Sequence, residues 1–306
     1  MKISIIGIGA MGCLFGSYLA PLSHVTLLGH WPEQVAALQT NGLTVIDTSG
    51  QTRQIALSVA TDPNQLPPAD LVIILVKSYQ TEQAARLAAN ILAPKGIILT
   101  LQNGLGNVEN ITAVLPHIPV TLGITAQGAT LIEPGLLRHA GHGPTYLAET
   151  AETAVCLQKV AHLLQQAGLE THLVADARGL AWGKLAINAA INPLTALLNV
   201  PNGFLAHNPT ARKFMMATAR EVTAVAHALA IQLPYLDAAA QALVVAKATA
   251  ANFSSMCQDV RNGRLTEIDA ICGQVVYYGQ QTGVPTPLNQ RLLTLIRSQP
   301  CTQPKQ

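Results

Sequence analysis

A glycine-rich motif directly after the first apolar run constrains the fold of this 306-residue chain more than any other feature. Residues 2–6 have the pattern of a β-strand, and residues 11–22 have that of a helix. The sequence between them reads G-x-G-x-x-G and consists of Gly7, Ile8, Gly9, Ala10, Met11 and Gly12. In such a unit the glycines permit a tight turn, close approach of the backbone to a pyrophosphate, and close packing of helix on strand. The motif predicts a dinucleotide-binding loop, and the similar loop of a methyltransferase is the alternative.

Short apolar runs alternate with helical patterns through the first half of the chain. The runs at 71–76 and 97–101 are wholly apolar, as expected for strands that are buried on both faces of a parallel sheet. Between residues 120 and 146, short strand patterns are separated by glycine and proline. We expect these later strands to be antiparallel additions at one edge of the sheet.

The pattern changes near residue 175, after which only long alanine- and leucine-rich helical segments follow. One of them spans residues 235–259 and is expected to form a single helix. The sequence therefore predicts an α/β fold, with an N-terminal Rossmann-type dinucleotide-binding domain over residues 1–175 and an all-α C-terminal domain over residues 176–306. The alanine-rich helices could also pack on a second copy of the chain, so the sequence leaves a homodimer open.

The composition excludes several classes of function. Lysine and arginine number 18 and aspartate and glutamate 16, a balance too even for a nucleic-acid-binding surface, so we expect no nucleic-acid partner. No apolar run approaches the roughly 20 residues that cross a bilayer, so we expect no membrane association.

The cysteines and histidines predict neither disulfides nor a metal site. The five cysteines are scattered without a C-x-x-C pair, which indicates reduced thiols in a cytoplasmic protein. Cys13, next to the glycine motif, is interpreted as a small packing residue. His139 and His142 lie in a glycine-rich segment without a third ligand at metal-binding spacing, and are interpreted as loop histidines.

The end of the second predicted strand bears on the choice of cofactor. An NAD-binding domain places a carboxylate there to bind the ribose hydroxyls, whereas the first acidic residue of this chain is Glu33. Without that carboxylate NADP(H) is favoured, although no lysine or arginine lies between Lys2 and Arg53 to pair with a 2′-phosphate. His30 is the one nearby side chain that could carry a positive charge, and a solvated loop histidine is the alternative.

Polar residues follow two of the strands expected at the centre of the sheet. Lys77 follows the run at 71–76, and Gln102-Asn103-Gly104 follows the run at 97–101. Ligands of open α/β sheets bind at the carboxyl ends of the strands. These residues are therefore candidates for contacts with cofactor or substrate, and ordinary strand-end loops are the alternative.

A polar stripe runs along the first helix of the second domain. Lys184, Asn188 and Asn192 are spaced four residues apart and lie on one face of an otherwise apolar helix. Burial lowers the pKa of a lysine toward a useful range for a general acid, and a lysine extended toward solvent is the alternative. Further along, Glu267 is expected in the first turn of a helix, where it could either interact with the helix dipole or bind substrate.

Taken together, these motifs resemble those of the ketopantoate reductase (2-dehydropantoate 2-reductase) family over essentially the full length of the chain. The resemblance rests on residues 7–12, Val76-Lys77, Gln102-Asn103-Gly104, Trp182-Gly183-Lys184-Leu185 with Asn188 and Asn192, Gln258-Asp259 and residues 266–269. It implies NADPH-dependent reduction of 2-dehydropantoate, a small 2-oxo acid, to (R)-pantoate on the route to pantothenate and coenzyme A.

The resemblance also implies roles for individual residues. Lys184 would be the general acid, and Glu267 would support it and help to fix the substrate. The implied ligands of substrate and cofactor are Asn188 and Asn192 for the substrate's hydroxyl end, Ser255 for its carboxylate, Asn103 for both molecules, and Lys77 for the nicotinamide end. The chain departs from the family pattern at His30, where an arginine is common. A related reductase of another small 2-oxo acid, or a non-enzymatic dinucleotide sensor, remains as an alternative.

Overall fold

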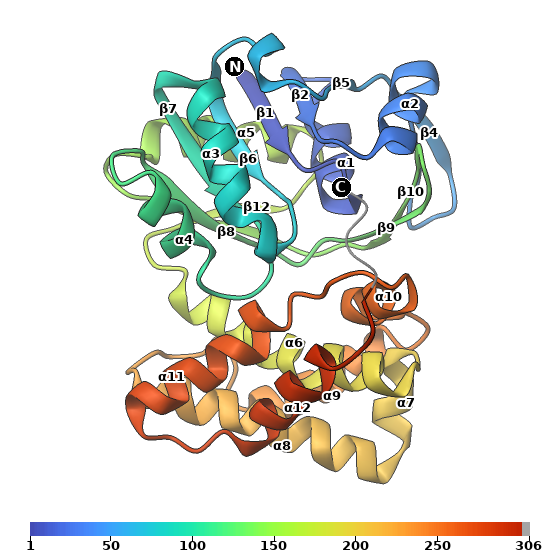
Figure 1. The fold of residues 1–306 in the computed structure, drawn as a ribbon, viewed down its shortest axis with the longest axis vertical. Coiled ribbons are helices and arrows are strands. Elements are labelled where there is room, and N and C mark those ends of the chain that lie inside the picture. The colour runs from blue at the N-terminus through green and yellow to red at the C-terminus, as the bar shows by residue number, and fades with distance from the viewer. Residues whose placement is uncertain (302–306) are drawn as a thin grey trace. The chain divides into compact units, whose positions relative to one another are not determined.

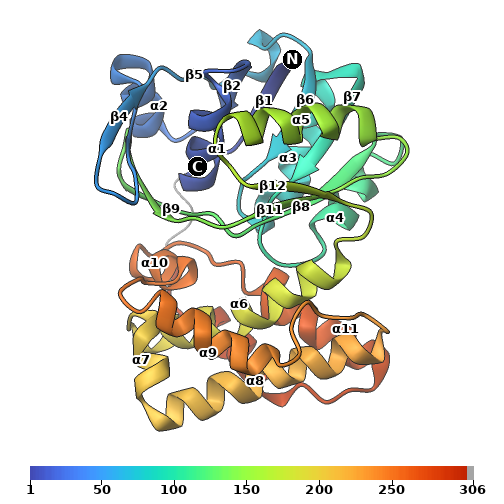
Figure 2. The same cartoon turned by 180° about the vertical axis from the view of Figure 1, so that it is seen from behind.

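The computed structural model describes residues 1–301, which group into two compact units. An α/β unit contains residues 1–102 and 107–177, and a helical unit contains residues 103–106 and 178–301. Figures 1 and 2 show the ribbon from opposite sides. Within the described residues, no helix has both the length and the apolar character required to cross a membrane.

The α/β unit is built on an eight-stranded sheet in the order β12-β11-β8-β7-β6-β1-β2-β5. Its strands are β1 (Lys2–Ile6), β2 (His24–Leu28), β5 (Ser58–Ala60), β6 (Ala69–Ile74), β7 (Leu92–Thr100), β8 (Val120–Thr125), β11 (Thr145–Ala148) and β12 (Thr171–Val174). Six neighbouring strands of this sheet are mutually parallel, namely β8, β7, β6, β1, β2 and β5. Strand β1 pairs with β2 on one side and β6 on the other, so the strand order reverses there. Ligands of doubly wound sheets bind at such a reversal.

Alternating side chains of the central strands form two apolar layers. Ile5, Ile73 and Leu99 pack with α1 (Ala10–Leu19) and α5 (Ala154–Gln166) on one face. The other face packs with α3 (Thr81–Ile91) and α4 (Asn107–Val114). Because strand residues alternate between faces, continuous apolar runs are needed to fill both layers, as the sequence predicts.

A second, four-stranded sheet has the order β4-β3-β10-β9. Its elements and the remaining short helices of this unit are β3 (Leu43–Ile46), β4 (Thr52–Ile55), β9 (Gly128–Glu133), β10 (Leu136–Gly141), α2 (Pro32–Asn41), and the 3₁₀ turns η1 (Pro63–Gln65) and η2 (Ser78–Gln80). The expectation of antiparallel edge strands over residues 120–146 is therefore partly wrong. Strand β8 is parallel to β7, and β9 and β10 leave the main sheet because β10 pairs with the distant β3. Within the main sheet, β11 is antiparallel to its neighbour β8, next to the edge strand β12.

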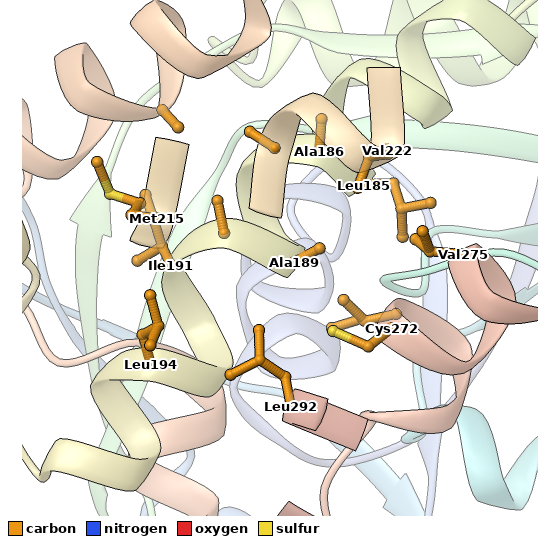
Figure 3. Packing of buried hydrophobic residues seen from close by; sticks show 14 of the residues in the cluster. Leu185, Ala186, Ala189, Ile191, Leu194, Met215, Val222, Cys272, Val275 and Leu292 are labelled. Carbon is orange, nitrogen blue, oxygen red and sulfur yellow. The ribbon is translucent and has the colours of Figure 1, made fainter. Parts of the chain in front are cut away.

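The helical unit is organised around α6 (Arg178–Leu198). The other helices are α7 (Asn202–His207), α8 (Pro209–Ala228), α9 (Ala238–Ala248), α10 (Ser255–Arg261), the π-helical turn η3 (Asp269–Gly273), α11 (Gln274–Thr282) and α12 (Pro287–Arg297). Figure 3 shows the core, in which Leu185 and Ala189 of α6 face a layer that includes Val222, Cys272 and Leu292.

The expected single helix over residues 235–259 is wrong, because the chain forms α9 and α10 with a break between them. The carbonyls of Ala250 and Asn252 accept hydrogen bonds from the N–H groups of Gly203 and Asn202 at the start of α7. Ser254 then begins α10 by accepting a hydrogen bond from the Cys257 N–H at 3.1 Å. Tertiary hydrogen bonds and a helix cap therefore override a uniform helical pattern.

Candidate functional site

The glycine motif lies at the carboxyl end of β1, where the order of strands reverses. Gly7 has φ +121°, and a Cβ there would lie 2.8 Å from the backbone of Leu75, which follows β6. A Cβ on Gly12 would lie 1.9 Å from the carbonyl oxygen of Gly7. At Gly9, by contrast, no described heavy atom beyond its neighbours in the chain lies within 4 Å of the Cβ position. The first and third glycines allow close packing of the protein, and the second keeps a space open.

The open space at Gly9 adjoins the N-terminus of α1. Gly9 is the N-cap residue of this helix. Because glycine has no side chain, nothing at this position covers the first turn. The first N–H groups of a helix lack partners within the helix and attract anions. Gly9 and the first turn of α1 therefore have the space and the N–H groups that an anionic group such as a pyrophosphate needs.

Two other predicted cofactor contacts, His30 and Lys77, lie in the same unit, whereas Asn103 belongs to the helical unit. His30 is exposed and lies between β2 and α2. Lys77 is partly buried and directly precedes η2, after the end of β6.

Gln102 joins the ends of β6 and β7, a role that the sequence did not reveal. Its Nε2 donates to the carbonyl of Val76 at 2.9 Å and to Thr81 Oγ1 at 2.9 Å. Its Oε1 accepts from Thr100 Oγ1 at 2.9 Å. The buried amide therefore anchors the backbone directly before Lys77.

The polar stripe lies on α6 in the helical unit. Lys184 and Asn188 are partly buried and Asn192 is buried. No hydrogen bond engages the side-chain amide of Asn188 or Asn192 within the described part of the chain. Burial lowers the pKa of Lys184 to about 8, and the negative charge of Glu267 partly opposes this shift. The stripe thus combines a lysine that titrates near neutrality with two amides that can bind a ligand.

Glu267 is only 6% exposed and lies just before η3, not in the first turn of a helix as expected. Its Oε2 accepts a hydrogen bond of 3.4 Å from Asn103 Nδ2. Residues 103–106 pack in the helical unit, and this is how Asn103 reaches Glu267. Asn103, Lys184 and Glu267, which are far apart in the sequence, thus belong to one structural unit.

The π-helical turn η3 holds the segment that carries Asn103. The carbonyl of Ala270 in this turn accepts a hydrogen bond of 2.9 Å from the Leu105 N–H. Gly104 has φ +83°, and a Cβ there would lie 2.3 Å from the same carbonyl oxygen. Gly104 therefore permits both the left-handed backbone and the close contact with η3. π-Helical turns frequently occur at functional sites.

We expect Gly104→Ala to lower the free energy of unfolding by about 1–3 kcal/mol more than Gly283→Ala, because overpacking adds to the backbone strain. Gly283 is a matched control, since it has φ +74° but no described heavy atom beyond its neighbours in the chain within 4 Å of its Cβ position. Urea unfolding of both variants measures the difference. Equal destabilisation would show that the contact with Ala270 does not restrict residue 104.

Ser255 is the exposed first residue of α10. Its placement depends on its neighbour Ser254, which sequence reasoning did not single out. Ser254 Oγ lies 2.7 Å from Thr195 Oγ1 and also donates to the carbonyl of Asn192 at 3.4 Å. Ser254 therefore connects the start of α10 to the end of the polar stripe. The sequence feature that could have identified Ser254 is a serine at the N-cap position of a short helix.

His139 differs from the prediction of a loop histidine, because it is buried in β10. Its Nδ1 lies 3.1 Å from Tyr18 Oη, and its Nε2 lies 2.8 Å from Gln127 Oε1. Burial and the neighbouring His142 lower the pKa of His139 to about 4. Packing of β10 on α1 accounts for this burial, which short-range patterns could not predict.

Comparisons with known proteins identify relatives of both units. A family model described as ketopantoate reductase PanE/ApbA matches residues 3–152, and the model of its C-terminal part matches residues 176–299. The 2-dehydropantoate 2-reductase of Halobacterium salinarum is 36% identical over 299 residues, covering 97% of this chain and 98% of that protein.

Two solved structures extend the comparison to the fold. A PanE/ApbA family ketopantoate reductase from Ralstonia eutropha has a TM-score of 0.87 and 32% identity, with 97% of each chain covered. A ternary complex of D-mandelate dehydrogenase with NADH and anilino(oxo)acetate has a TM-score of 0.88 and 27% identity, with 98% of each chain covered. Both family models and the full-length similarity lead to one conclusion: this chain belongs to the ketopantoate reductase family.

Proposed function

We propose that the protein catalyses the NADPH-dependent reduction of 2-dehydropantoate to (R)-pantoate, a step toward pantothenate and coenzyme A. The observation that carries the proposal is the group formed by Lys184, Glu267 and Asn103 in the helical unit. A partly buried lysine with a pKa of about 8, next to a buried carboxylate, is suited to proton donation near neutral pH. The names of the full-length relatives agree with this reaction.

We assign cofactor binding to residues 1–175. The backbone of residues 7–12 and the first turn of α1 would hold the pyrophosphate, Lys77 would lie near the nicotinamide end, and His30 near the adenosine ribose. NADPH, when bound, supplies the hydride that reduces the ketone carbon. The protein's own task is to orient the dinucleotide and the oxo acid.

We assign substrate binding and acid catalysis to residues 176–306 together with Asn103. Residues 302–306 lie outside the described part of the chain. The Lys184 ammonium stabilises the ketone oxygen as negative charge develops and transfers a proton from Nζ to it, leaving the alcohol and a neutral amine. The Glu267 carboxylate favours the charged form of Lys184, so that the acid is ready before reaction.

The remaining polar groups of this unit would orient the substrate. The amides of Asn188 and Asn192 bind its hydroxyl end, and the Ser255 hydroxyl binds its carboxylate. The amide of Asn103 would contact both substrate and cofactor. The two amides on α6 lack side-chain hydrogen bonds in the described chain, so a substrate hydroxyl would replace solvent as their partner.

The preference for NADPH rests on the end of β2, where no acidic residue is present. A carboxylate at this position would repel the 2′-phosphate of NADPH. Solved complexes of the D-mandelate dehydrogenase contain NADH, so the related reductase of another 2-oxo acid is the competing function.

Steady-state oxidation of NADPH and of NADH, each with 2-dehydropantoate and with an aromatic 2-oxo acid, tests the proposal. We expect the highest kcat/KM with NADPH and 2-dehydropantoate. Selectivity of more than about 100-fold for the other acid, equivalent to roughly 2.7 kcal/mol, would favour the competing reductase. Higher kcat/KM with NADH would overturn the cofactor assignment, and dinucleotide binding without turnover of either acid would indicate a sensor.

The pH dependence of kcat/KM tests the protonation state of Lys184. Only the charged amine can donate a proton, so kcat/KM should be constant at lower pH and fall as pH rises through about 8. Glu267→Gln removes the charge that raises this pKa, and should move the midpoint to lower pH. Asp269→Asn is the control, since Asp269 is exposed and paired with Arg297. A midpoint that Glu267→Gln leaves unchanged would contradict the coupling.

A further inference from the structure

Two buried polar side chains are hydrogen-bonded in series to the glycine motif, and neither contributes to the chemistry proposed above. Cys13, on α1, and Gln34, on α2, both have 0% of their surface exposed. The thiol of Cys13 donates to the carbonyl of Ile8 at 3.3 Å, and Gln34 Nε2 donates to Cys13 Sγ at 3.2 Å. Gln34 Oε1 accepts from the N–H of Gly135 at 2.9 Å. Cys13 is therefore more than the packing residue that the sequence predicted.

The chemistry of these groups fixes the direction of the hydrogen bonds. Burial raises the pKa of the Cys13 thiol to about 12, so its single S–H remains available to donate to Ile8. The sulfur then accepts from Gln34, whose amide oxygen is already engaged by Gly135. In a site without access to water, loss of one member leaves the others without a partner. The three bonds therefore act as a connected relay (Ile8–Cys13–Gln34–Gly135).

The relay joins two parts of the proposed cofactor site. Ile8 is the second residue of the glycine motif, so its carbonyl belongs to the loop assigned to the pyrophosphate. Gln34 lies in the first turns of α2, directly after the 29–31 segment that follows β2 and is assigned to the ribose. The same parts also touch at Gly29, where a Cβ would lie 2.7 Å from the Ile8 side chain. The polar relay and the apolar contact thus both connect the loop to this segment.

We propose that Cys13 and Gln34 are positioning residues that set the spacing between the pyrophosphate loop and the ribose-binding segment. This inference rests on the proposed dinucleotide-dependent function and concerns the affinity for the cofactor. Neither side chain needs to touch the dinucleotide, because each acts through the backbone: Cys13 through Ile8, and Gln34 through α2. The relay should therefore affect binding of the adenosine-diphosphate half and leave the rate of the chemical step unchanged.

Four single variants separate positioning from general stability. Cys13→Ala deletes the thiol, and Gln34→Met replaces the amide with an apolar side chain of similar size, so each removes relay bonds. Cys13→Ser instead retains a donor for Ile8 and an acceptor for Gln34. Ser17→Ala is the matched control on α1, because Ser17 is equally buried and its hydroxyl donates to Leu14 at 2.8 Å, away from the loop. Fluorescence titration measures the Kd for NADPH, and competition with NADPH measures the Kd for 2′,5′-ADP. The kcat at saturating NADPH reports the catalytic rate, and Tm reports the stability of each variant.

We expect Cys13→Ala and Gln34→Met to raise both Kd values about tenfold, a change of roughly 1.4 kcal/mol, with kcat unchanged within about twofold. Cys13→Ser should restore wild-type affinity, and Ser17→Ala should lower Tm without changing Kd. Unchanged Kd in Cys13→Ala and Gln34→Met, or equal effects in Ser17→Ala, would overturn the positioning role although the wild type binds NADPH. If Cys13→Ala does not fold, Gln34→Met and Cys13→Ser still decide the question. Failure of the wild type to bind NADPH would instead overturn the proposed function itself, and this inference with it.

Discussion

Lys184→Ala is expected to lower kcat by about 1,000-fold, in the range typical for loss of a general acid, while the Kd for NADPH changes by less than about twofold. The alanine variant has no group in place of Nζ to protonate the ketone oxygen or to stabilise its developing charge. Cofactor binding should persist, because the glycine loop belongs to the α/β unit and Lys184 to the helical unit. Steady-state reduction of 2-dehydropantoate and fluorescence titration with NADPH measure the two quantities.

Two further lysine variants sharpen this test. Lys184→Arg keeps a positive charge, but a guanidinium is a poor proton donor near neutral pH, so its kcat should also remain far below that of the wild type. Lys247→Ala removes an exposed lysine of α9 in the same unit and should leave kcat unchanged. Near-normal turnover of Lys184→Ala would eliminate this residue as the acid.

Gly9→Val is expected to weaken NADPH binding by about 100-fold with little change in stability. The backbone of Gly9 has φ −76° and ψ −172°, an extended conformation that valine adopts readily. The added side chain would occupy the open space at the start of α1 and displace the pyrophosphate from one or two charged hydrogen bonds, each typically contributing about 1.5–3 kcal/mol. Titration with NADPH and thermal unfolding of the same sample check both parts.

Gly12→Ala provides the contrasting result. Its Cβ would lie 1.9 Å from the carbonyl oxygen of Gly7, so this variant should lose stability as well as affinity. A Gly9→Val protein that binds NADPH as well as the wild type would show that the pyrophosphate does not approach this residue.

Much of the α/β unit could be predicted because its signals are local. The apolar runs at 71–76 and 97–101 fill both faces of a parallel sheet, and the glycine motif specifies a strand, a turn and a helix within a few residues. The polar stripe was also visible, since its residues recur at helical spacing on one apolar helix. In each case the physical requirement is met by neighbours in the sequence.

The features that the sequence did not reveal depend on distant partners. Strand β10 joins β3 rather than the main sheet, and the packing of β10 on α1 buries His139. The Ala270 carbonyl of η3 binds Leu105, which lies more than 160 residues earlier in the chain. Gln34 has no local pattern that distinguishes it from a solvated glutamine, and only the fold brings it to Cys13. Such contacts are set by tertiary packing, which periodicity does not encode.

The placement of residues 103–106 has a consequence for dividing or recombining this protein. The chain leaves the α/β unit after residue 102, returns at residue 107 and leaves again after residue 177. A fragment ending near residue 177 would carry Leu105 without the carbonyl of Ala270, and the complementary fragment would carry Glu267 without Asn103. A chimera that exchanges residues 1–177 also replaces residues 103–106, so it must keep the native loop that contacts the retained helical unit. The boundary between the two units is therefore discontinuous in sequence.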